Sequence, residues 1–284
     1  MKRLMISALL LLLACTTLSA GSSKPPASYE YKILLKPGNF ASTERVCRLF
    51  WDLVEKVAAS HGFTARQKAK SSPEREIRFI DSAAFDLNKK GFLLRIRSEN
   101  NRSEMTLKFR STDLASATAA PVEPAGQYGD DISLEADVAV KMTIPVSIFS
   151  RSGRIDNFKQ APNTVSALCE YYPGLARTGL DIALKLVDVN NISIIEHRLL
   201  HGTIDFGFDK VKTLFSIWFI KGKSQPIAAE FSFKIKAGKY LKSGKHDAQQ
   251  QIDSFFVDLV RRGKLFINSQ QTKTGMVYQY QTED

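Results

Sequence analysis

Repeated alternation of apolar residues with charged or polar ones is the feature of this sequence that most constrains its fold. The alternating segments are residues 28–35, 92–97, 104–110, 132–138 and 229–236. Successive side chains of a strand point to opposite faces, so each segment predicts a strand with one apolar and one charged face. Further strands are predicted at 76–80, 194–200, 203–208 and 214–221. Roughly nine strands are enough to curl into a closed or nearly closed antiparallel barrel.

Helical periodicity is confined to a few segments of the chain. Apolar residues recur at helical spacing in 43–61, after Ser42 as a cap, and in 247–262, before Gly263. A weaker helix is predicted at 163–172, and Gly, Ala, Ser and Pro crowd 111–129, which predicts a long mobile loop on the rim. The fold class is therefore α+β, with the two longer helices lying on the apolar face of the sheet.

The charged strand faces carry two paired motifs, Arg95-x-Arg97 and Lys108-x-Arg110, on strands predicted to be neighbours. The ordinary interpretation of each charged face is exposure to bulk water. However, like charges opposite one another destabilise a sheet unless anions or nearby carboxylates offset them. With the charged face turned inward, the lumen would be basic. Arg and Lys there would suit phosphate, and carboxylates could hold a hard divalent metal.

These segments resemble a known family. Residues 79–82 (FIDS), 87–97 (LNKKGFLLRIR) and 106–108 (TLK) resemble the most specific run of the CYTH-like triphosphate tunnel family. The weaker matches are 28–32 (SYEYK), 133–137 (SLEAD), 230–238 (EFSFKIKAG) and 272–273 (TK). The resemblance implies an eight-stranded antiparallel β-barrel, a tunnel flanked by helices that binds polyphosphate or an organic triphosphate. Members with a full set of acidic residues use magnesium or manganese to hydrolyse or transfer phosphoryl groups.

The resemblance and the alternation together assign roles to particular residues. The phosphate-binding candidates are Lys32, Arg95, Arg97, Lys108, Arg110, Lys236 and Lys273. The metal-ligand candidates are Glu30, Glu135, Asp137 and Glu230, of which Glu135 and Asp137 are also the catalytic candidates for positioning an attacking water. The expected metal is Mg or Mn.

The sequence also departs from the family pattern. Family acidic positions fall on Ser28, Ser232 and Lys234, an expected Arg falls on Ser133, and an Arg-rich strand is replaced by 189–192. Three hypotheses therefore stay open. The chain is a metal-dependent triphosphatase, a non-catalytic polyanion-binding protein with a degenerate metal site, or an envelope scaffold with a vestigial tunnel.

The first 20 residues have the layout of a secretory signal peptide. Lys2 and Arg3 precede an apolar run that ends at Ala14, too short to span a bilayer permanently. The run 12–15 (LLAC) resembles a bacterial lipobox, in which Cys15 would be lipidated; ordinary cleavage after Ala20 is the alternative. Residues 21–27 would form a tether and 28–284 a single tunnel domain. The expected location is across the inner membrane, as a periplasmic protein or an outer-membrane lipoprotein.

The formal net charge of +11 favours acidic partners, and because the leader contributes only two of the basic residues, the mature chain stays basic. Secretion argues against nucleic acid as the partner. Cys47 and Cys169 could form a disulfide in an oxidising compartment or remain two buried thiols. His197 and His201 have a spacing that could hold zinc on a helix, but they fall in a predicted strand and read as surface or packed residues.

Overall fold

The computed structural model describes residues 25–38, 43–242, 247–268 and 272–281. The predicted signal peptide, Cys15 and part of the predicted tether lie outside these residues. The strands, in chain order, are β1 (Ser28–Leu35), β2 (Thr64–Ser71), β3 (Arg75–Asp81), β4 (Phe92–Glu99), β5 (Arg102–Ser111), β6 (Ile132–Lys141), β7 (Ile144–Asp156), β8 (Val187–Asp188), β9 (Ile194–Asp205), β10 (Lys210–Ile220) and β11 (Pro226–Lys236).

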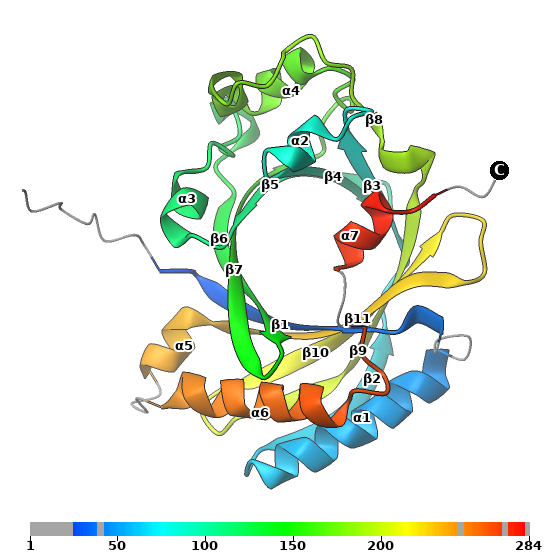
Figure 1. Cartoon of the computed structure of the whole chain (residues 1–284), viewed down its shortest axis with the longest axis vertical. Coiled ribbons are helices and arrows are strands. Elements are labelled where there is room, and N and C mark those ends of the chain that lie inside the picture. The colour runs from blue at the N-terminus through cyan, green and yellow to red at the C-terminus, as the bar shows by residue number, and fades with distance from the viewer. Residues whose placement is uncertain (1–24, 39–42, 243–246, 269–271, 282–284) are drawn as a thin grey trace, which may run out of the picture.

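Nine of these strands close into a barrel in the order β9-β10-β11-β1-β6-β7-β5-β4-β3, with β3 pairing back onto β9. Figure 1 shows the ring nearly end on. The closed barrel with helices outside it confirms the predicted α+β tunnel architecture. The predicted eight antiparallel strands were wrong in detail, because nine strands close the ring and β1 runs parallel to β6. Strand β2 continues the sheet beyond β9, and β8 pairs with β3.

Seven α-helices and three short 3-10 helices accompany the barrel in the described part of the chain. They are α1 (Thr43–Ser60), α2 (Asp86–Lys89), α3 (Leu114–Ala119), η2 (Gly126–Tyr128), α4 (Val165–Tyr171), η3 (Pro173–Arg177), η4 (Val189–Asn191), α5 (Ala237–Lys242), α6 (Ala248–Arg262) and α7 (Lys273–Tyr278). The three predicted helices are confirmed as α1, α4 and α6. In the described residues no helix is both long and apolar enough to cross a bilayer.

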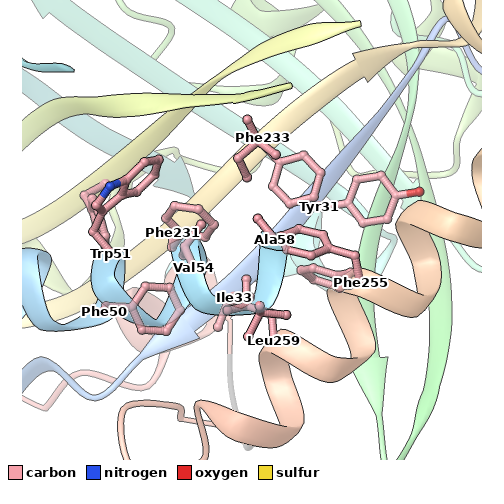
Figure 2. Packing of buried hydrophobic residues seen from close by; sticks show 14 of the residues in the cluster. Tyr31, Ile33, Phe50, Trp51, Val54, Ala58, Phe231, Phe233, Phe255 and Leu259 are labelled. Carbon is pink, nitrogen blue, oxygen red and sulfur yellow. The ribbon is translucent and has the colours of Figure 1, made fainter. Parts of the chain in front are cut away.

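Helices α1 and α6 cover one side of the barrel, as Figure 1 shows. Their apolar faces pack on the outward-facing residues of β1, β10 and β11. Tyr31 stacks on Phe233, and Phe50 of α1 contacts Phe231 (Figure 2). This core fixes the orientation of the sheet, because the residues that alternate with these aromatic side chains must point into the barrel.

A second layer, formed by α2, α3 and α4, covers the opposite side of the barrel (Figure 1). Part of it is the segment 111–129, which was expected to be a long loop. Instead it forms α3 and η2 and buries Ala117, Ala120 and Val122. Gly153 of β7 makes this possible, since a Cβ there would lie 1.8 Å from the carbonyl oxygen of Val122.

The two cysteines of the described residues lie in different parts of this core. Cys47 is buried with α1 and Cys169 packs in the second layer, and both are free thiols. His197 and His201 lie on strand β9, as the sequence indicated, with His197 near Glu74 and His201 against Trp51.

Candidate functional site

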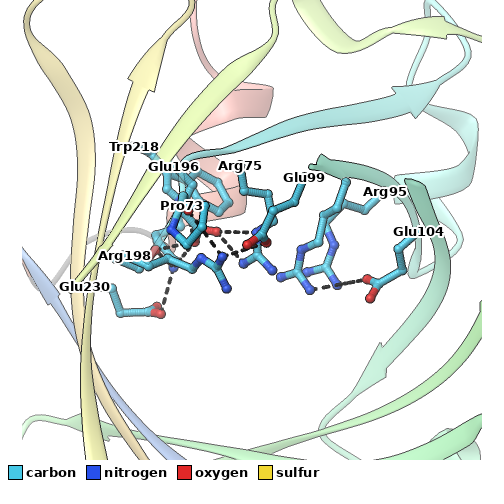
Figure 3. Close-up of polar contacts among 12 residues, drawn as sticks. Pro73, Arg75, Arg95, Glu99, Glu104, Glu196, Arg198, Trp218 and Glu230 are labelled. Carbon is cyan, nitrogen blue, oxygen red and sulfur yellow. Dashed lines mark hydrogen bonds and ion pairs between the residues drawn. The ribbon is translucent and has the colours of Figure 1, made fainter. Parts of the chain in front are cut away.

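The strand registers turn the charged faces into the barrel. On β1, Tyr31 and Ile33 pack against the helices, so Glu30 and Lys32 point inward. The charged residues on the inner face include Glu30, Lys32, Arg75, Arg95, Arg97, Glu104, Lys108, Arg110, Glu135, Asp137, Arg154, Asp156, Glu196, Arg198, Glu230 and Lys234, with Lys236 on the same face at the end of β11. Figure 3 shows several of them directed into the space that the strands enclose.

One end of the barrel, the open mouth, is formed by the β4–β5 hairpin and the end of β7. A cavity of about 850 Å³ opens there, lined by Arg75, Arg97, Glu99, Asn100, Arg102, Ser103, Glu104, Arg154, Asp156 and Asn157. Oε1 of Glu104 lies 3.4 Å from Arg97 and 3.7 Å from Arg95, and its other oxygen lies 3.5 Å from Arg154. A single carboxylate therefore serves three guanidinium groups.

Further along β5, positive charge has no direct counterion. Lys108 and Arg110 form no hydrogen bond or ion pair with any described residue, and both are only partly exposed. Arg110 pairs in register with Ser150 of β7, whose buried hydroxyl also lacks a partner. The buried Nε atoms of Arg95, Arg97 and Arg110 are unpaired as well. We call Arg95, Arg97, Lys108, Arg110 and Ser150 the cationic wall.

The cations of the cationic wall are poorly solvated, and their charges repel one another. Burial lowers the pKa of Lys108 to about 7, and the charges of Arg110, Lys32 and Arg95 push in the same direction. Burial lowers the pKa of Arg97 to about 10, and burial together with Arg97 holds the pKa of Arg95 well below its usual range. Glu104 offsets this effect only in part for Arg95 and Arg97, and Asp137 only in part for Lys108, so an inserted anion would supply the missing negative charge.

The predicted metal ligands are occupied by lysines. Nζ of Lys32 lies 2.8 Å from Asp137 and 3.0 Å from Glu30, and Nζ of Lys234 lies 2.8 Å from Glu135. Burial would raise the pKa of Asp137, but Lys32, Lys108 and Arg110 outweigh it and hold that pKa well below its usual value.

The oxygen atoms of these carboxylates are not free to bind Mg or Mn. A hard divalent cation needs several free oxygen ligands. Each carboxylate here already bonds an ammonium group. In the described part of the chain no three Asp, Glu, His or Cys side chains are arranged to hold a metal. The residues present therefore do not fit the expected metal.

Glu230, the fourth predicted metal ligand, lies apart from the other three, at the end of the barrel opposite the open mouth. It contacts Lys273, the first residue of α7, at 2.9 Å, and Nζ of Lys273 also donates to Ser216 at 2.8 Å. The same ammonium lies 4.7 Å from the ring centroid of Trp218. Lys273, predicted to bind phosphate, is thus surrounded by acidic and aromatic groups.

Helix α7 lies inside the ring in Figure 1 and plugs this second end. Its Val277 is buried in an apolar cluster with Ile77, Phe79 and Trp218. Asp81 anchors it, since the hydroxyl of Tyr278 donates to Asp81 at 3.1 Å. Helix α7 therefore narrows this end of the barrel.

Several residues of the site were not predicted from the sequence. Arg154 and Ser150 belong to β7, which was not predicted because Gly153 and Arg151 interrupt its alternation. Glu196 and Arg75 were not singled out, although Nε of Arg75 donates to Glu196 at 2.7 Å. The alternation of residues 194–200, already visible in the sequence, could have located Glu196 on an inner face.

Comparisons with known proteins give remote likenesses only. No family model and no curated protein matches the chain. A candidate adenylyl cyclase from Hippeastrum with dominant triphosphatase activity aligns at 12% identity and a TM-score of 0.40, over 87% of this chain and 93% of that one. A candidate adenylate cyclase from Bacillus halodurans aligns at 12% identity and 0.40, over 87% and 96%. One from Vibrio parahaemolyticus aligns at 10% identity and 0.35, over 89% and 99%. At these scores neither substrate nor activity carries over to this chain.

Proposed function

We propose that the protein binds a small phosphate-rich anion, of the triphosphate class, inside its barrel and without a metal ion. The observation that carries this proposal is the cationic wall, where Lys108 and Arg110 lie partly buried without a counterion. A buried, unpaired cation is costly, so a site that keeps several together is suited to an anion that neutralises them.

The chemistry of the wall favours phosphate over a carboxylate ligand. Guanidinium groups donate two parallel hydrogen bonds to neighbouring phosphate oxygens, and a lysine adds a point charge. The unpartnered hydroxyl of Ser150 supplies a further donor beside Arg110. Because Arg95 and Arg97 continue the wall toward the open mouth, the anion would carry more than one phosphate.

The acidic residues support metal-dependent hydrolysis less well than they support binding alone. Glu30 and Asp137 each bond Lys32, and Glu135 bonds Lys234. For this reason the proposed function is binding, and tripolyphosphate is expected to remain intact in the site.

Calorimetry with tripolyphosphate tests the proposal. We expect binding that is unchanged by a chelator, and at least about tenfold weaker binding in the double variant Lys108→Gln, Arg110→Gln, because two charge-assisted contacts are lost. The matched control is Lys159→Gln, Arg177→Gln, two exposed cations outside the barrel that form no ion pair with a residue the structure describes. No binding to the wild-type protein would overturn the proposal.

A second measurement separates binding from catalysis. Phosphate release from tripolyphosphate is followed with Mg²⁺ or Mn²⁺ added. Metal-dependent release that disappears in Glu135→Gln would instead support the triphosphatase hypothesis.

We further propose that the chain is exported and lipidated at Cys15. The sequence of residues 1–20 supports this, and those residues lie outside the described part. Incorporation of a labelled fatty acid into the wild-type chain but not into Cys15→Ala, expressed in a bacterial host, tests it.

A further inference from the structure

Beyond the barrel, the sheet carries a second cluster of positive charge. The residues are Arg66 and Lys70 of β2, Lys210 and Lys212 of β10, and Lys236 of β11, which we call the basic platform. All five are exposed, and none forms an ion pair with a described residue. The lumen site does not use them.

The pairing registers place the basic platform on the helix-free face of the sheet. Ala65, Ile204 and Val211 pack into the core beneath α1 and α6. The alternate residues of the same strands must therefore point the other way. Arg66 pairs with Thr203, which pairs with Lys212, so these three form one row across β2, β9 and β10 on that face.

A neighbouring row leads directly into the lumen. In register it runs from Lys70 through Leu200, Leu214 and Ser232 to Lys32. Five neighbouring strands lie about 5 Å apart, so the row spans roughly 20 Å from the outer edge of β2 to the interior. The basic platform and the lumen are thus one continuous surface.

Strand direction puts the basic platform at the open mouth. Strand β9 ends at Asp205, β10 begins at Lys210 and β11 ends at Lys236, and antiparallel pairing brings these termini to the same end of the barrel as the β4–β5 hairpin. Helix α7 narrows the other end. The wider entrance to the tunnel, where the cavity opens, is therefore the end that the basic platform flanks.

We propose that the basic platform binds the outer part of a linear polyphosphate chain whose end occupies the lumen. This inference rests on the proposed function and adds that the ligand is a polyphosphate chain longer than tripolyphosphate. A flexible, narrow chain with one charge per phosphate can follow a concave strand face into a barrel. A duplex nucleic acid or a membrane surface is too broad to do so. Two acids oppose the charge on the platform rows: Asp205, which pairs with Lys210, and Glu135, which shares a row with Lys236 and already bonds Lys234.

Chain-length dependence of binding tests the inference. Affinities for tripolyphosphate and for long-chain polyphosphate are compared in the wild-type protein and in Arg66→Gln, Lys210→Gln, Lys212→Gln. We expect the long chain to bind more tightly than tripolyphosphate. The variant should lose about tenfold or more for the long chain, and the slope of log affinity against log salt should become shallower by about 2. Its tripolyphosphate affinity should change less than twofold.

Two further variants keep the result interpretable. The triple variant Lys56→Gln, Lys89→Gln, Lys264→Gln removes three exposed lysines that lie in or next to the outer helices α1, α2 and α6. It should leave the chain-length preference intact. Because positive charge on an edge strand can also protect against aggregation, Lys210→Gln, Lys212→Gln leaves β2 unchanged and should still weaken long-chain binding.

The outcomes separate this inference from the proposed function. If tripolyphosphate binds and longer chains bind no more tightly, the role of the basic platform is overturned and the lumen site is not. Long-chain binding that depends on the basic platform, without tripolyphosphate binding, overturns the lumen site, and with it the placement of the chain end in the lumen, but supports the basic platform. Equal losses in the helix-side control, or equally tight platform-dependent binding of duplex DNA or anionic vesicles, would overturn the assignment to a linear polyphosphate.

Discussion

Nζ of Lys32 lies 2.8 Å from Oδ1 of Asp137, across the parallel pairing of β1 and β6. Glu30 pairs in register with Asp137, so Lys32 reaches diagonally to neutralise both carboxylates. Burial alone would lower the pKa of Lys32, but Glu30 and Asp137 outweigh it and raise that pKa. The cluster that the sequence indicated as a metal site is therefore an internal ion pair network.

Removing the carboxylate of Asp137 should destabilise the fold in a pH-dependent way. The folded-state pKa of Asp137 is depressed, chiefly because Lys32 overcomes the effect of burial, so its stabilising contribution is present above pH 4 and is lost progressively as pH falls below that value. At pH 7, Asp137→Asn should cost about 3 kcal/mol, because Lys32 loses a buried partner. At pH 2 the cost should be clearly smaller, because part of that contribution has been lost.

Urea denaturation from pH 2 to pH 7 measures both values. The control is Asp130→Asn, an exposed acid without an ion pair among the described residues. A cost for Asp137→Asn that is the same at pH 2 and pH 7 would contradict the ion pair interpretation.

Removing the charge of Lys108 should stabilise the protein. Its folded-state pKa of about 7 lies below the ordinary value near 10.4, so the unfolded chain binds the extra proton between these pH values. Wild-type stability should therefore rise from pH 7 to pH 10. At pH 7, Lys108→Met should be more stable by about 2 kcal/mol, with the difference closing by pH 10, and should bind tripolyphosphate at least about tenfold more weakly.

Chemical denaturation between pH 6 and pH 10, with calorimetry at pH 7, checks this trade between stability and binding. Lys141→Met, at the exposed tip of the β6–β7 hairpin, serves as the control and should change neither quantity appreciably. A loss of stability at pH 7 would show that Lys108 has a counterion.

The barrel could be predicted because the alternation in β1, β4, β5, β6 and β11 is regular. Its closure could not be predicted in detail. Strand β7 contains Gly153, which is required by the carbonyl of Val122 pressed against it, and this contact is invisible in the sequence. Residues 194–200 and 203–208 were predicted as two strands, but a bulge near His201 lets β9 run through as one.

The inner cations could be predicted from the same alternation, whereas their partners could not. Arg95, Arg97, Lys108 and Arg110 all lie on the inner face, as expected. Which of them lack a counterion depends on pairing between distant segments, such as the pairing of β5 with β7 that places Ser150 and not an acid opposite Arg110. Likewise, the acids at Glu30 and Asp137 were visible, but the parallel pairing of β1 with β6 that brings Lys32 between them was not.

Glu104 should limit anion affinity, since it competes for Arg95, Arg97 and Arg154. Glu104→Gln leaves these guanidinium groups without their shared carboxylate. We expect tripolyphosphate to bind several-fold more tightly, and the free energy of unfolding without ligand to fall by about 2 kcal/mol. Glu123→Gln is the control, because Glu123 pairs with Arg151 on the outer face of β7. Weaker binding in Glu104→Gln would mean that Glu104 orients the arginines for the anion.

The α7 plug should depend on the hydrogen bond from Tyr278 to Asp81. Asp81 also accepts backbone N–H groups of Ser82 at 2.7 Å, Leu87 at 2.9 Å and Asn88 at 3.0 Å, which fixes the start of α2. Tyr278→Phe should cost about 1 kcal/mol, and Asp81→Asn about 2 to 3 kcal/mol, because its amide N–H would face donors.

The double variant of Tyr278 and Asp81 distinguishes a direct bond from two independent roles. Its cost should be about 1 kcal/mol less than the sum of the single costs, since both changes remove the same hydrogen bond. Hydrogen exchange of residues 273–278 should accelerate in each variant, because α7 then detaches more often from the barrel. Tyr128→Phe is the control, a hydroxyl with no hydrogen-bond partner among the described residues that should cost nothing measurable. Fully additive costs would show that the hydrogen bond from Tyr278 to Asp81 does not hold α7 and that Asp81 serves only α2.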